Sequence, residues 1–510
     1  MRDGDGGGPD WAASTLDVQS HYERFLETYA LSGDEDARPG EAGLDSLALA
    51  ELLVILERAV IRIGDHDLQE ELHIPLLQRL TISEISALVR GFQRGPDDWA
   101  IDLRTKLDKV KREREESEAA AMRRDALLDV QGDGAVPRAD GTFKDVLLTG
   151  ATGFLGPYLL RSLLDQTSAV YTVLVRAAGP VAARERLRTD LVAAGLYDQR
   201  TAEAFGARVH AICGDLASPR LGLSDHVWLQ LAETIDTIVH NGAWVDYILD
   251  YEKLRPSNVE GTRELLKLAC ASSRKQFHFV SSTTIFGWTG KRQLLEQDSN
   301  PEMDGLDFGY AQTKWVSEQL LLQAREQGID ARIYRPAFLT ASTAGLGHST
   351  DIVVRLLSFM IKYGVAPNAD IQLSFMPVDI AARNIAAVMT SAAEPTGPVL
   401  HVTIDEYFNM VDLTTQISKD YGIPFRYVSL EQFSHEMKKT CTAEDPVFPL
   451  VDFIARAHSK VIVMEGKRYR NTAFRLALER SGAGVPDVSL RETVSFLMAH
   501  LRAEGMLPPD

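Results

Sequence analysis

Tyr310 and Lys314 stand four residues apart in the run Tyr-Ala-Gln-Thr-Lys. Residues four apart share one face of a helix, so the lysine ammonium would lie close to the tyrosine ring. A neighbouring cation lowers the pKa of a phenol, which would make Tyr310 a proton donor to a developing alkoxide. The pair follows Val-Ser-Ser-Thr-Thr, where the Ser282 hydroxyl can hold the same oxygen. Thr283 is the alternative to Ser282 if the register shifts by one residue. For Tyr310 and Lys314, the alternative is a chance pair on the protein surface.

A glycine-rich run precedes these residues in the chain. It follows an apolar strand predicted over 145–149 and precedes an apolar helix predicted over 158–164. Without Cβ atoms, such a turn lets the backbone approach a pyrophosphate, and the helix N-terminus supplies N–H donors and the positive end of a dipole. We therefore predict a dinucleotide site, against the alternative of a tight turn with no ligand. The predicted contacts in this run are Gly150, Thr152, Gly153, Phe154, Leu155 and Gly156.

The next predicted strand ends at Arg176, twenty residues beyond Gly156. Sites that prefer NAD usually place Asp or Glu here to bind the ribose 2′-hydroxyl, whereas arginine suits the 2′-phosphate of NADP. Arg184 and Arg186 follow and can add positive charge. The sequence thus favours NADP, with a solvated arginine at a strand end as the alternative. The Tyr–Lys pair would also contact the cofactor, through the nicotinamide ribose.

Two further strand ends carry candidate cofactor contacts. Asp215 and Leu216 follow the third predicted strand, and the Asp215 carboxylate can accept a hydrogen bond from the adenine amino group. Asn241 and Ala243 follow the fourth strand, where small residues would bring the backbone beside the cofactor. Either pair equally fits ordinary turn chemistry at strand ends.

Near the N-terminus, the run Gly-Leu-Asp-Ser-Leu opens a second apolar helix. A serine in this place, Ser46, is suited to carry a flexible covalent arm. The alternative is that Asp45 and Ser46 simply cap the helix, a role that both residue types fill well.

The segments before residue 143 are predicted to be helical or irregular. Residues 1–14 are expected to be a disordered lead, and 15–95 an all-α four-helix domain with a short helix near 68–78. Residues 96–142 would be a linker that contains a solvated, highly charged helix over 99–128.

From residue 143 onward, short apolar strands alternate with helices. This alternation predicts an α/β Rossmann domain with a doubly wound parallel sheet over 143–405. An insertion near 340–375 and the mostly helical tail 406–510 would form a smaller substrate domain. The predicted strands are 145–149, 170–175, 208–213, 237–240, 278–282, 331–334 and 399–402.

Composition excludes several classes of function. The formal net charge is −18 over 510 residues, and residues 1–95 alone hold 18 Asp/Glu against 8 Arg and no Lys. This acidity argues against nucleic acid as a partner and favours basic partners for the N-terminal part. No apolar run approaches the roughly 18 residues of a membrane span, and the N-terminus lacks the apolar core of a signal peptide. We therefore expect a cytoplasmic protein without a membrane span.

The three cysteines, Cys213, Cys270 and Cys441, are widely spaced. They form neither a Cys-x-x-Cys motif nor a cluster with histidine. This pattern predicts buried thiols in a reducing compartment, with neither a disulfide framework nor a metal site.

The motifs from residue 143 to about 400 resemble those of the extended short-chain dehydrogenase/reductase family. Within it they resemble the thioester reductase domains that terminate nonribosomal peptide and polyketide synthetases and carboxylic acid reductases. The resemblance implies that Ser282 is the catalytic hydroxyl, where many such domains carry Thr, and that Tyr310 and Lys314 are the general acid and its lysine. Asn258 resembles a helix asparagine that shapes the family's site. The supporting runs are TGATGFLG, VLVRA, GDL, HNGAWV, SNVEGT, VSSTT, YAQTKW, YRPA and MPVD.

Residues 15–95 resemble an acyl or peptidyl carrier domain, with GLDSL as its attachment motif. The resemblance implies that Ser46 receives 4′-phosphopantetheine from a phosphopantetheinyl transferase, with Asp45 on the acidic face that the transferase meets. It also implies an upstream adenylation or condensation/ketosynthase module, in cis or in trans.

The two resemblances together imply NADPH-dependent reductive release of an acyl or peptidyl thioester held on Ser46. The product would be an aldehyde, or an alcohol after a second reduction. The alternatives are an NAD-using sugar-nucleotide epimerase or dehydratase, a fatty acyl-CoA reductase with an added carrier, and a redox-silent domain. The redox-silent domain would release product by Dieckmann-type cyclisation or only dock to a synthetase. Substrate selection is expected in the helical tail, for example at 448–454, where apolar residues would line a pocket or pack the core.

Overall fold

The structure of this chain is a computed structural model that divides into two compact units. Unit 1 comprises Met1–Ala121, Tyr247–Lys253 and Ser434–Ala457, and unit 2 comprises Met122–Asp246, Leu254–Phe433 and His458–Asp510. Each unit is described by itself. The described residues are 11–29, 31, 36–63, 68, 72–92, 95–129, 136–137, 143–349, 351–393, 396–461, 466–485 and 487–507.

Seven parallel strands form the central sheet of unit 2, in the order β13-β9-β7-β5-β2-β3-β4. The chain order reverses at β2, which lies between β3 and β5. In open sheets of this kind, ligands bind outside the carboxyl ends of the strands at such a reversal. The strands are β2 (Asp145–Thr149), β3 (Val170–Val175), β4 (Val209–Cys213), β5 (Thr237–His240), β7 (Gln276–Val280), β9 (Ala331–Pro336) and β13 (Val399–Val402).

The observed strands confirm the predicted α/β sheet, with small differences at three of them. β4 begins one residue later than predicted, β9 runs two residues longer, and β7 spans Gln276–Val280 instead of 278–282. The last difference places Ser282 beyond the strand, as the N-cap of the 3₁₀ helix Thr283–Phe286. Short, almost fully buried runs explain why the strands could be predicted, because a parallel sheet covered on both faces needs continuous apolar strands.

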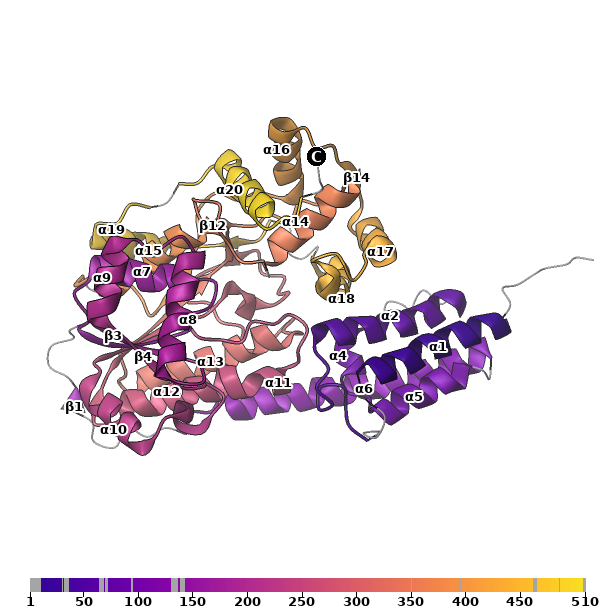
Figure 1. Cartoon of the computed structure of the whole chain (residues 1–510), viewed down its shortest axis with the longest axis horizontal. Helices are drawn as coiled ribbons and strands as arrows, with labels where there is room; N and C mark the ends of the chain where they lie inside the picture. The colour runs from indigo at the N-terminus through magenta and orange to yellow at the C-terminus, as the bar shows by residue number, and fades with distance from the viewer. Residues whose placement is uncertain are drawn as a thin grey trace, which may run out of the picture. The chain divides into compact units, whose positions relative to one another are not determined.

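Helices cover both faces of the sheet in unit 2 (Figure 1). On one side, α7 packs against α15 and α15 against α19, with α8 and α9 beside β4. On the other side, α12 packs against β5 and α13 against β9. These helices are α7 (Gly156–Gln166), α8 (Pro180–Ala193), α9 (Gln199–Arg208), α10 (Asp225–Thr234), α12 (Gly261–Cys270), α13 (Gly309–Glu326), α15 (Val378–Thr390) and α19 (Thr472–Ser481).

A smaller group of elements in unit 2 comes from the predicted insertion and from the tail. α20 (Leu490–Ala503) packs against α14 (Ile352–Tyr363) and α16 (Met410–Tyr421). Four two-stranded parallel pairs accompany them: β1 (Val136–Pro137) with β6 (Ser273–Arg274), β8 (Gln293–Leu294) with β15 (Arg468–Tyr469), β10 (Phe338–Thr340) with β12 (Phe375–Pro377), and β11 (Val365–Pro367) with β14 (Arg426–Val428).

The regular elements of unit 1 in its described part are helices. α1 (Trp11–Thr28), α2 (Ser46–Ile63) and α5 (Ile82–Gly91) lie side by side, and the short α4 (Ile74–Leu77) contacts α2 (Figure 1). α1 begins at Trp11, inside the predicted lead 1–14, of which residues 1–10 lie outside the described residues. Of the predicted helix near 68–78, the structure describes α4 and single residues before it. The segment Ser434–Ala457, with the end of α17 (Leu430–Thr440) and the start of α18 (Val451–Val461), also belongs to this unit.

The charged helix predicted over 99–128 is observed as α6 (Pro96–Asp125), but it is not fully solvated. Trp99 is buried, donates a hydrogen bond from Nε1 to the Leu88 carbonyl and packs edge-on against Phe92. Leu103 and Leu107 are also buried. One apolar stripe thus packs the first half of α6 into unit 1, a pattern that the many charges on its other faces concealed in the sequence.

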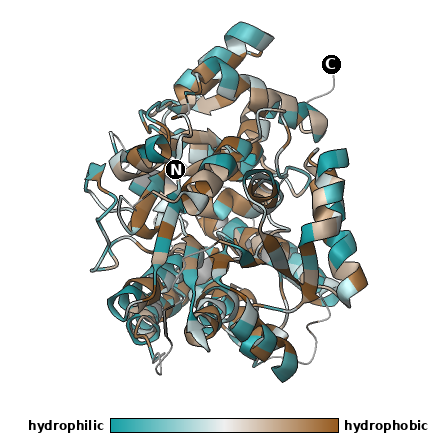
Figure 2. Ribbon diagram, turned by 90° about the vertical axis from the view of Figure 1, so that its left-hand side faces the viewer, coloured by the Kyte–Doolittle hydropathy of each residue, from teal (hydrophilic) through white to brown (hydrophobic). Residues whose placement is uncertain are grey.

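Burial in the described residues follows the alternation of polar and apolar side chains. Helices carry hydrophobic and hydrophilic residues on opposite faces (Figure 2), and the strands of the sheet supply much of the largest apolar core. In the part of the chain that the structure describes, no helix is long and apolar enough to cross a membrane. The prediction of buried thiols was wrong in degree, since Cys213, Cys270 and Cys441 are only half-buried.

Candidate active site

The glycine-rich turn lies at the reversal point of the sheet. The last residues of β2 and β5, Thr149 and His240, pair in register, so that the chain leaves both strands at the same edge. Gly150 has φ of 72°, and a Cβ on it would lie 2.4 Å from the Gly242 backbone nitrogen. A Cβ on Gly156, the first residue of α7, would lie 2.2 Å from the Gly150 carbonyl oxygen. Both positions therefore require glycine to keep the turn close to its neighbours.

The residues after β5 hold this turn in place. Asn241 donates a hydrogen bond from Nδ2 to the Gly150 carbonyl oxygen at 3.0 Å, and the Gly242 N–H donates to Thr149 Oγ1 at 3.1 Å. Leu216 lies against the same backbone, since a Cβ on Gly242 would come 2.8 Å from its Cδ1. The turn after β2, the residues after β5 and Leu216 thus lie together, and their contacts with a cofactor stay a prediction. The same two loops hold the remaining predicted contacts Thr152, Phe154, Leu155 and Ala243. Gly153 also lies in the first loop, where it is exposed, and a Cβ on it would meet no atom closer than 3.6 Å.

The arginines that follow β3 separate into two groups. Arg176 is exposed at the end of β3. Arg186 donates a hydrogen bond from Nη1 to the backbone carbonyl of Arg176 at 2.9 Å. Arg184 instead donates to the carbonyls of Val209 and Phe205 and lies over the Phe205 ring. The expectation that Arg184 adds charge to the site is therefore wrong, because β4 and α9 hold its guanidinium.

Asp215 takes part in the turn that follows β4. Its Oδ1 accepts a hydrogen bond from the Ala217 N–H at 2.9 Å, and its backbone N–H donates to the Leu221 carbonyl. The turn chemistry considered as the alternative is thus present. The adenine contact of Asp215 stays a prediction.

α13 brings the Tyr–Lys pair to the first turns of a helix, as its spacing predicted. Tyr310 and Lys314 are both buried, and Lys314 Nζ lies 5.9 Å from the centre of the Tyr310 ring. The ammonium also donates to the Val280 carbonyl oxygen at 2.6 Å and lies 4.5 Å from the centre of the Phe279 ring. Burial lowers the pKa of Lys314 to about 7, against the opposing effect of the Glu318 charge. The charge of this lysine therefore depends on pH near neutrality.

Ser282 lies directly beyond β7, whose last carbonyl binds Lys314. Its Oγ accepts a hydrogen bond from the Thr284 N–H at 3.2 Å, which leaves the hydroxyl proton available for a substrate oxygen. Thr283 is buried, and its hydroxyl interacts with the phenol of Tyr469. The structure therefore favours Ser282 over Thr283 as the hydroxyl of the site.

Sequence reasoning missed a buried ion pair beneath the site. Arg335 and Glu318 each expose about 1% of their side chains and pair at 2.6 Å. Glu318 also accepts a hydrogen bond from Ser281, the neighbour of Ser282. A signal was present, since Glu318 follows Lys314 by four residues and Arg335 lies in the run YRPA that was quoted only for the resemblance.

A second missed feature is a chain of buried polar groups between the glycine turn and α13. His240 contacts Thr149 Oγ1 at 2.8 Å through Nδ1 and Thr262 Oγ1 at 3.0 Å through Nε2. Thr262 donates to the Asn258 carbonyl, and Asn258 donates from Nδ2 to Thr313 Oγ1, three residues after Tyr310. Burial lowers the pKa of His240 well below its usual value, so that the imidazole is neutral. Asn258, noted from the SNVEGT run, is thus one link in a longer connection.

The predicted attachment residue, Ser46, is the first residue of α2 in unit 1. Asp45 is exposed and its Oδ1 accepts a hydrogen bond from the Ala48 N–H at 2.9 Å, so that Asp45 caps the helix. Because Asp45 supplies the cap, the capping alternative does not require Ser46. The other predicted site residues lie in unit 2.

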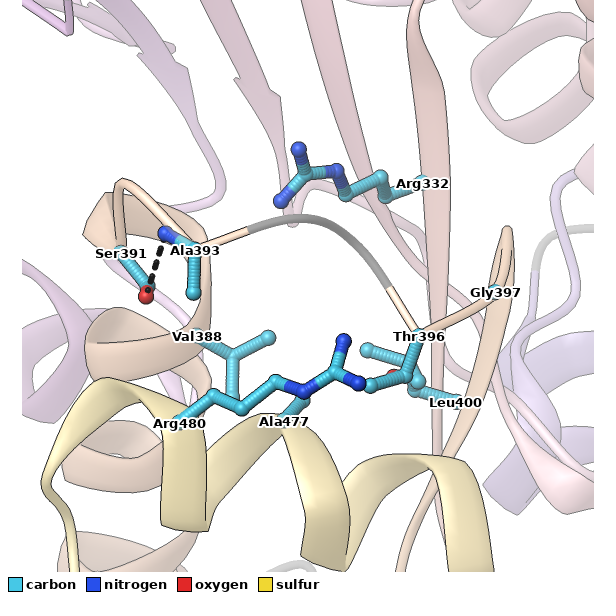
Figure 3. Close-up of a pocket in the computed structure, with 9 residues that line it drawn as sticks. All are labelled: Arg332, Val388, Ser391, Ala393, Thr396, Gly397, Leu400, Ala477 and Arg480. Carbon is cyan, nitrogen blue, oxygen red and sulfur yellow. Dashed lines mark hydrogen bonds between the residues drawn. The ribbon is translucent and has the colours of Figure 1, made fainter.

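A small open pocket in unit 2 lies away from all of these residues. Arg332 and Arg480 point into it from opposite sides (Figure 3). It borders the amino ends of β9 and β13, whereas the glycine turn and Ser282 follow the carboxyl ends of their strands. The pocket therefore does not coincide with the predicted site. Its lining residues are Arg332, Val388, Ser391, Ala393, Thr396, Gly397, Leu400, Ala477 and Arg480.

Known proteins resemble this chain in sequence and in fold. Residues 148–385 match the NAD-binding family described as male sterility protein. L-2-aminoadipate reductase large subunit from Penicillium chrysogenum is 33% identical over 399 residues, which cover 71% of this chain and 27% of that protein. The chain thus spans about a quarter of this curated relative.

Two solved structures have similar folds. The terminal R domain from the myxalamid PKS-NRPS biosynthetic pathway is 28% identical, with a TM-score of 0.67 and coverage of 77% of this chain and 99% of that one. A thiolation-reductase di-domain from an archaeal non-ribosomal peptide synthetase is 17% identical, with a TM-score of 0.69 and coverage of 97% and 98%; at this identity it supports the fold alone. Residues 148–385 thus belong to this NAD-binding family, and the relatives support an oxidoreductase of the thioester reductase kind within the extended short-chain dehydrogenase/reductase family.

Proposed function

We propose that this chain reduces an acyl or peptidyl thioester, held on a 4′-phosphopantetheine arm at Ser46, with NADPH as the reductant. One observation carries the proposal most directly. Lys314 is buried beside the Tyr310 ring and bound to the end of β7, next to Ser282. A buried ammonium beside a tyrosine ring is suited to stabilise the phenolate that forms when the tyrosine gives its proton to an oxyanion.

The residues at the switch point fit a nicotinamide dinucleotide. Gly150 and Gly242 approach so closely that a Cβ on Gly150 would lie 2.4 Å from the Gly242 nitrogen. A turn without Cβ atoms at the start of α7 is the kind of backbone that a pyrophosphate can approach. Arg176 and Arg186 offer positive charge at the end of β3, where a 2′-phosphate would bind, and this supports NADPH over NADH. When bound, the cofactor supplies a hydride. Lys314 and Tyr310 are the groups proposed to meet its nicotinamide ribose.

The proposed reaction balances with residues of this chain and one reductant. A hydride adds to the thioester carbonyl carbon, and the electron pair of the C=O bond moves to the oxygen. Ser282 and Tyr310 donate hydrogen bonds to this oxyanion, and Tyr310 transfers its proton to it while the Lys314 ammonium stabilises the phenolate. The resulting hemithioacetal then breaks its C–S bond as its C=O bond re-forms. Its hydroxyl proton returns to the Tyr310 phenolate and the departing thiolate takes a proton from solvent, which releases an aldehyde and leaves the free thiol on the arm at Ser46. A second hydride transfer to the aldehyde would give the alcohol.

The first test concerns the arm. The chain is incubated with CoA and a phosphopantetheinyl transferase, and the intact mass is measured. The proposal expects a gain of one phosphopantetheine group, which Ser46→Ala abolishes. A chain that gains no mass would overturn the carrier half of the proposal.

The second test concerns the reduction. The holo chain is loaded with an acyl group, and NADPH oxidation and aldehyde are followed together. Tyr310→Phe is expected to slow the reaction about 10²- to 10⁴-fold, the usual contribution of a positioned acid, while NADPH still binds. An unchanged rate would exclude Tyr310 as the proton donor. Release of product without NADPH oxidation would favour the redox-silent alternative.

A further inference from the structure

Unit 1 contains more than the predicted carrier domain. The segment Ser434–Ala457, called the dock below, belongs to the same compact unit as α1, α2, α4 and α5. The sequence assigns the dock to the C-terminal tail, which follows the sheet of unit 2. A stretch of the tail thus packs with the helices that carry Ser46.

An apolar contact joins the dock to α2. The 3₁₀ helix Phe448–Leu450 packs against α2, and Val447, Phe448 and Leu450 are all buried. The expectation that residues 448–454 line a substrate pocket is therefore wrong for these side chains. They pack a core instead, which was the alternative considered for them.

Two polar contacts flank this apolar one. Lys438 Nζ donates to Glu57 Oε1 on α2 at 2.9 Å, with only 17% and 10% of the two side chains exposed. The Ile74 N–H, at the start of α4, donates to Asp452 Oδ2 at 3.1 Å. Arg456 pairs with the same Asp452 oxygen at 3.2 Å. The contacts of Lys438 with Glu57 and of Ile74 with Asp452 join residues that lie far apart in the sequence, whereas Arg456 and Asp452 lie four residues apart on one helix.

Because the Glu57–Lys438 pair is mostly buried, it can determine which surface α2 accepts as a partner. Burial raises the pKa of Glu57, and the Lys438 charge opposes this rise. A carboxylate in such a place is stabilised by its ion pair, and removal of one partner leaves a buried charge without compensation. Charge pairs of this kind decide which surfaces associate more than they add to the total affinity.

We propose that the dock is the surface by which the C-terminal tail of this chain binds its own carrier, with Glu57–Lys438 and Ile74–Asp452 as its polar anchors. The role of this docking rests on the proposed function, because docking would favour delivery of the thioester held on this chain's own carrier. The partner is the α2–α4 surface of this carrier, where Glu57 and the Ile74 N–H meet Lys438 and Asp452.

The first experiment measures docking without any substrate. Amide hydrogen exchange is followed in the full-length holo chain for wild type, Lys438→Glu and Asp452→Ala. Both variants are expected to speed exchange in 72–77 and 447–456, and Asp452→Ala most of all at Ile74. Unchanged exchange in both variants would overturn the proposal.

The second experiment compares two forms of the same octanoyl thioester, one loaded on Ser46 and one on free N-acetylcysteamine. Glu57→Lys and Lys438→Glu are each expected to slow reduction of the loaded form about tenfold, with no effect on the free form. The double exchange Glu57→Lys/Lys438→Glu is expected to restore the rate and the exchange protection. Equal loss on both substrates, or no rescue, would contradict docking.

Matched controls separate docking from folding and from net charge. Glu23→Lys on α1 and Lys439→Glu on α17 make the same charge changes at exposed positions, and both are expected to behave as wild type. Phosphopantetheinylation of Glu57→Lys at the wild-type rate shows that its carrier is folded. If wild type reduces neither thioester, the proposed function fails, while the exchange experiment still decides the docking.

Discussion

Lys314 is the residue whose charge matters most at the site, and burial governs that charge. Its pKa is lowered to about 7, so at pH 8 the free protein holds it mostly as the neutral amine. An anionic nucleotide with ribose hydroxyls favours the ammonium form. We therefore expect NADPH binding at pH 8 to take up a proton, and the affinity to fall as pH rises above about 7. Titration calorimetry in buffers of different ionisation enthalpy measures the uptake directly.

The control for this titration is a second buried lysine. Burial also lowers the pKa of Lys467, to about 8, so it is a rival source of the proton. The Lys467→Met variant should still take up a proton when NADPH binds. The Lys314→Met variant should take up none in the NADPH binding that it retains. A binding enthalpy that does not depend on the buffer in the wild-type chain would refute the assignment.

The glycine turn offers a comparison between two glycines three residues apart. Gly150→Ala puts a Cβ 2.4 Å from the Gly242 nitrogen at a φ of 72°, whereas Gly153→Ala meets only the Gly150 oxygen at 3.6 Å. The first change should lower the free energy of unfolding by about 1–3 kcal/mol, from backbone strain and the forced separation of two loops. It should also abolish NADPH binding. Urea unfolding and cofactor fluorescence measure the two effects.

Gly153→Ala is expected to fold with a free energy of unfolding within about 0.5 kcal/mol of wild type, the usual range for unconstrained surface changes. If Gly150→Ala and Gly153→Ala lost the same free energy of unfolding, the close approach of Gly150 to Gly242 would not be the reason that the turn requires glycine.

At the scale of elements, the Glu318–Arg335 pair joins α13 to β9, and Ser281 joins the same carboxylate to the end of β7. Glu318→Gln leaves the Arg335 charge buried without its partner, so the free energy of unfolding should fall by about 3–5 kcal/mol. Glu318→Gln/Arg335→Met should recover much of that loss, because no charge then remains to be compensated. Denaturant unfolding measures both. Glu326→Gln, an exposed change on the same helix, is the control and should be neutral.

The strands and the glycine turn could be predicted because their signals are local. Buried parallel strands require continuous apolar runs, and the turn requires glycine at fixed offsets. The spacing of Tyr310 and Lys314 is likewise a local signal. For Glu318 and Arg335 the local signal is partial: the spacing places Glu318 on the face of Lys314, but its pairing with Arg335 depends on α13 and β9 meeting in the fold. The charged α6 shows the same limit, because only the fold reveals that Trp99 faces a core.

At the scale of the whole molecule, the sequence predicted the kinds of segment but not their grouping. The tail was expected to form one subdomain over 406–510, whereas Ser434–Ala457 belongs to unit 1. The cause is the pairing of Glu57 with Lys438 and of Ile74 with Asp452, contacts that join residues more than 370 positions apart. No periodicity or motif in a single sequence encodes such a pairing.

One chain that holds both Ser46 and Tyr310 should reduce its own thioester without a second molecule. A tethered arm presents the thioester at a high effective concentration, so the rate per chain should not depend on protein concentration. Mixing two inactive variants tests this. Holo Tyr310→Phe keeps a loaded arm without a proton donor, and Ser46→Ala keeps the donor without an arm. Their mixture should reduce the thioester far more slowly than wild type, with a rate that rises with the concentration of Ser46→Ala.

A mixture that recovers the wild-type rate at low concentration would instead mean that arms serve neighbouring chains, as in a dimer that exchanges carriers. The charge-exchange variants distinguish the two cases further. If delivery occurs within one chain through the dock, Lys438→Glu must act on the loaded chain in which it is placed. If delivery occurs between chains, the same change must act when it is placed on the Ser46→Ala chain, which receives the arm. Lys438→Glu is therefore placed on the Tyr310→Phe chain, on the Ser46→Ala chain, on both or on neither, and rapid-quench measurement of aldehyde from these four mixtures decides whether Glu57 and Lys438 pair within one molecule during catalysis.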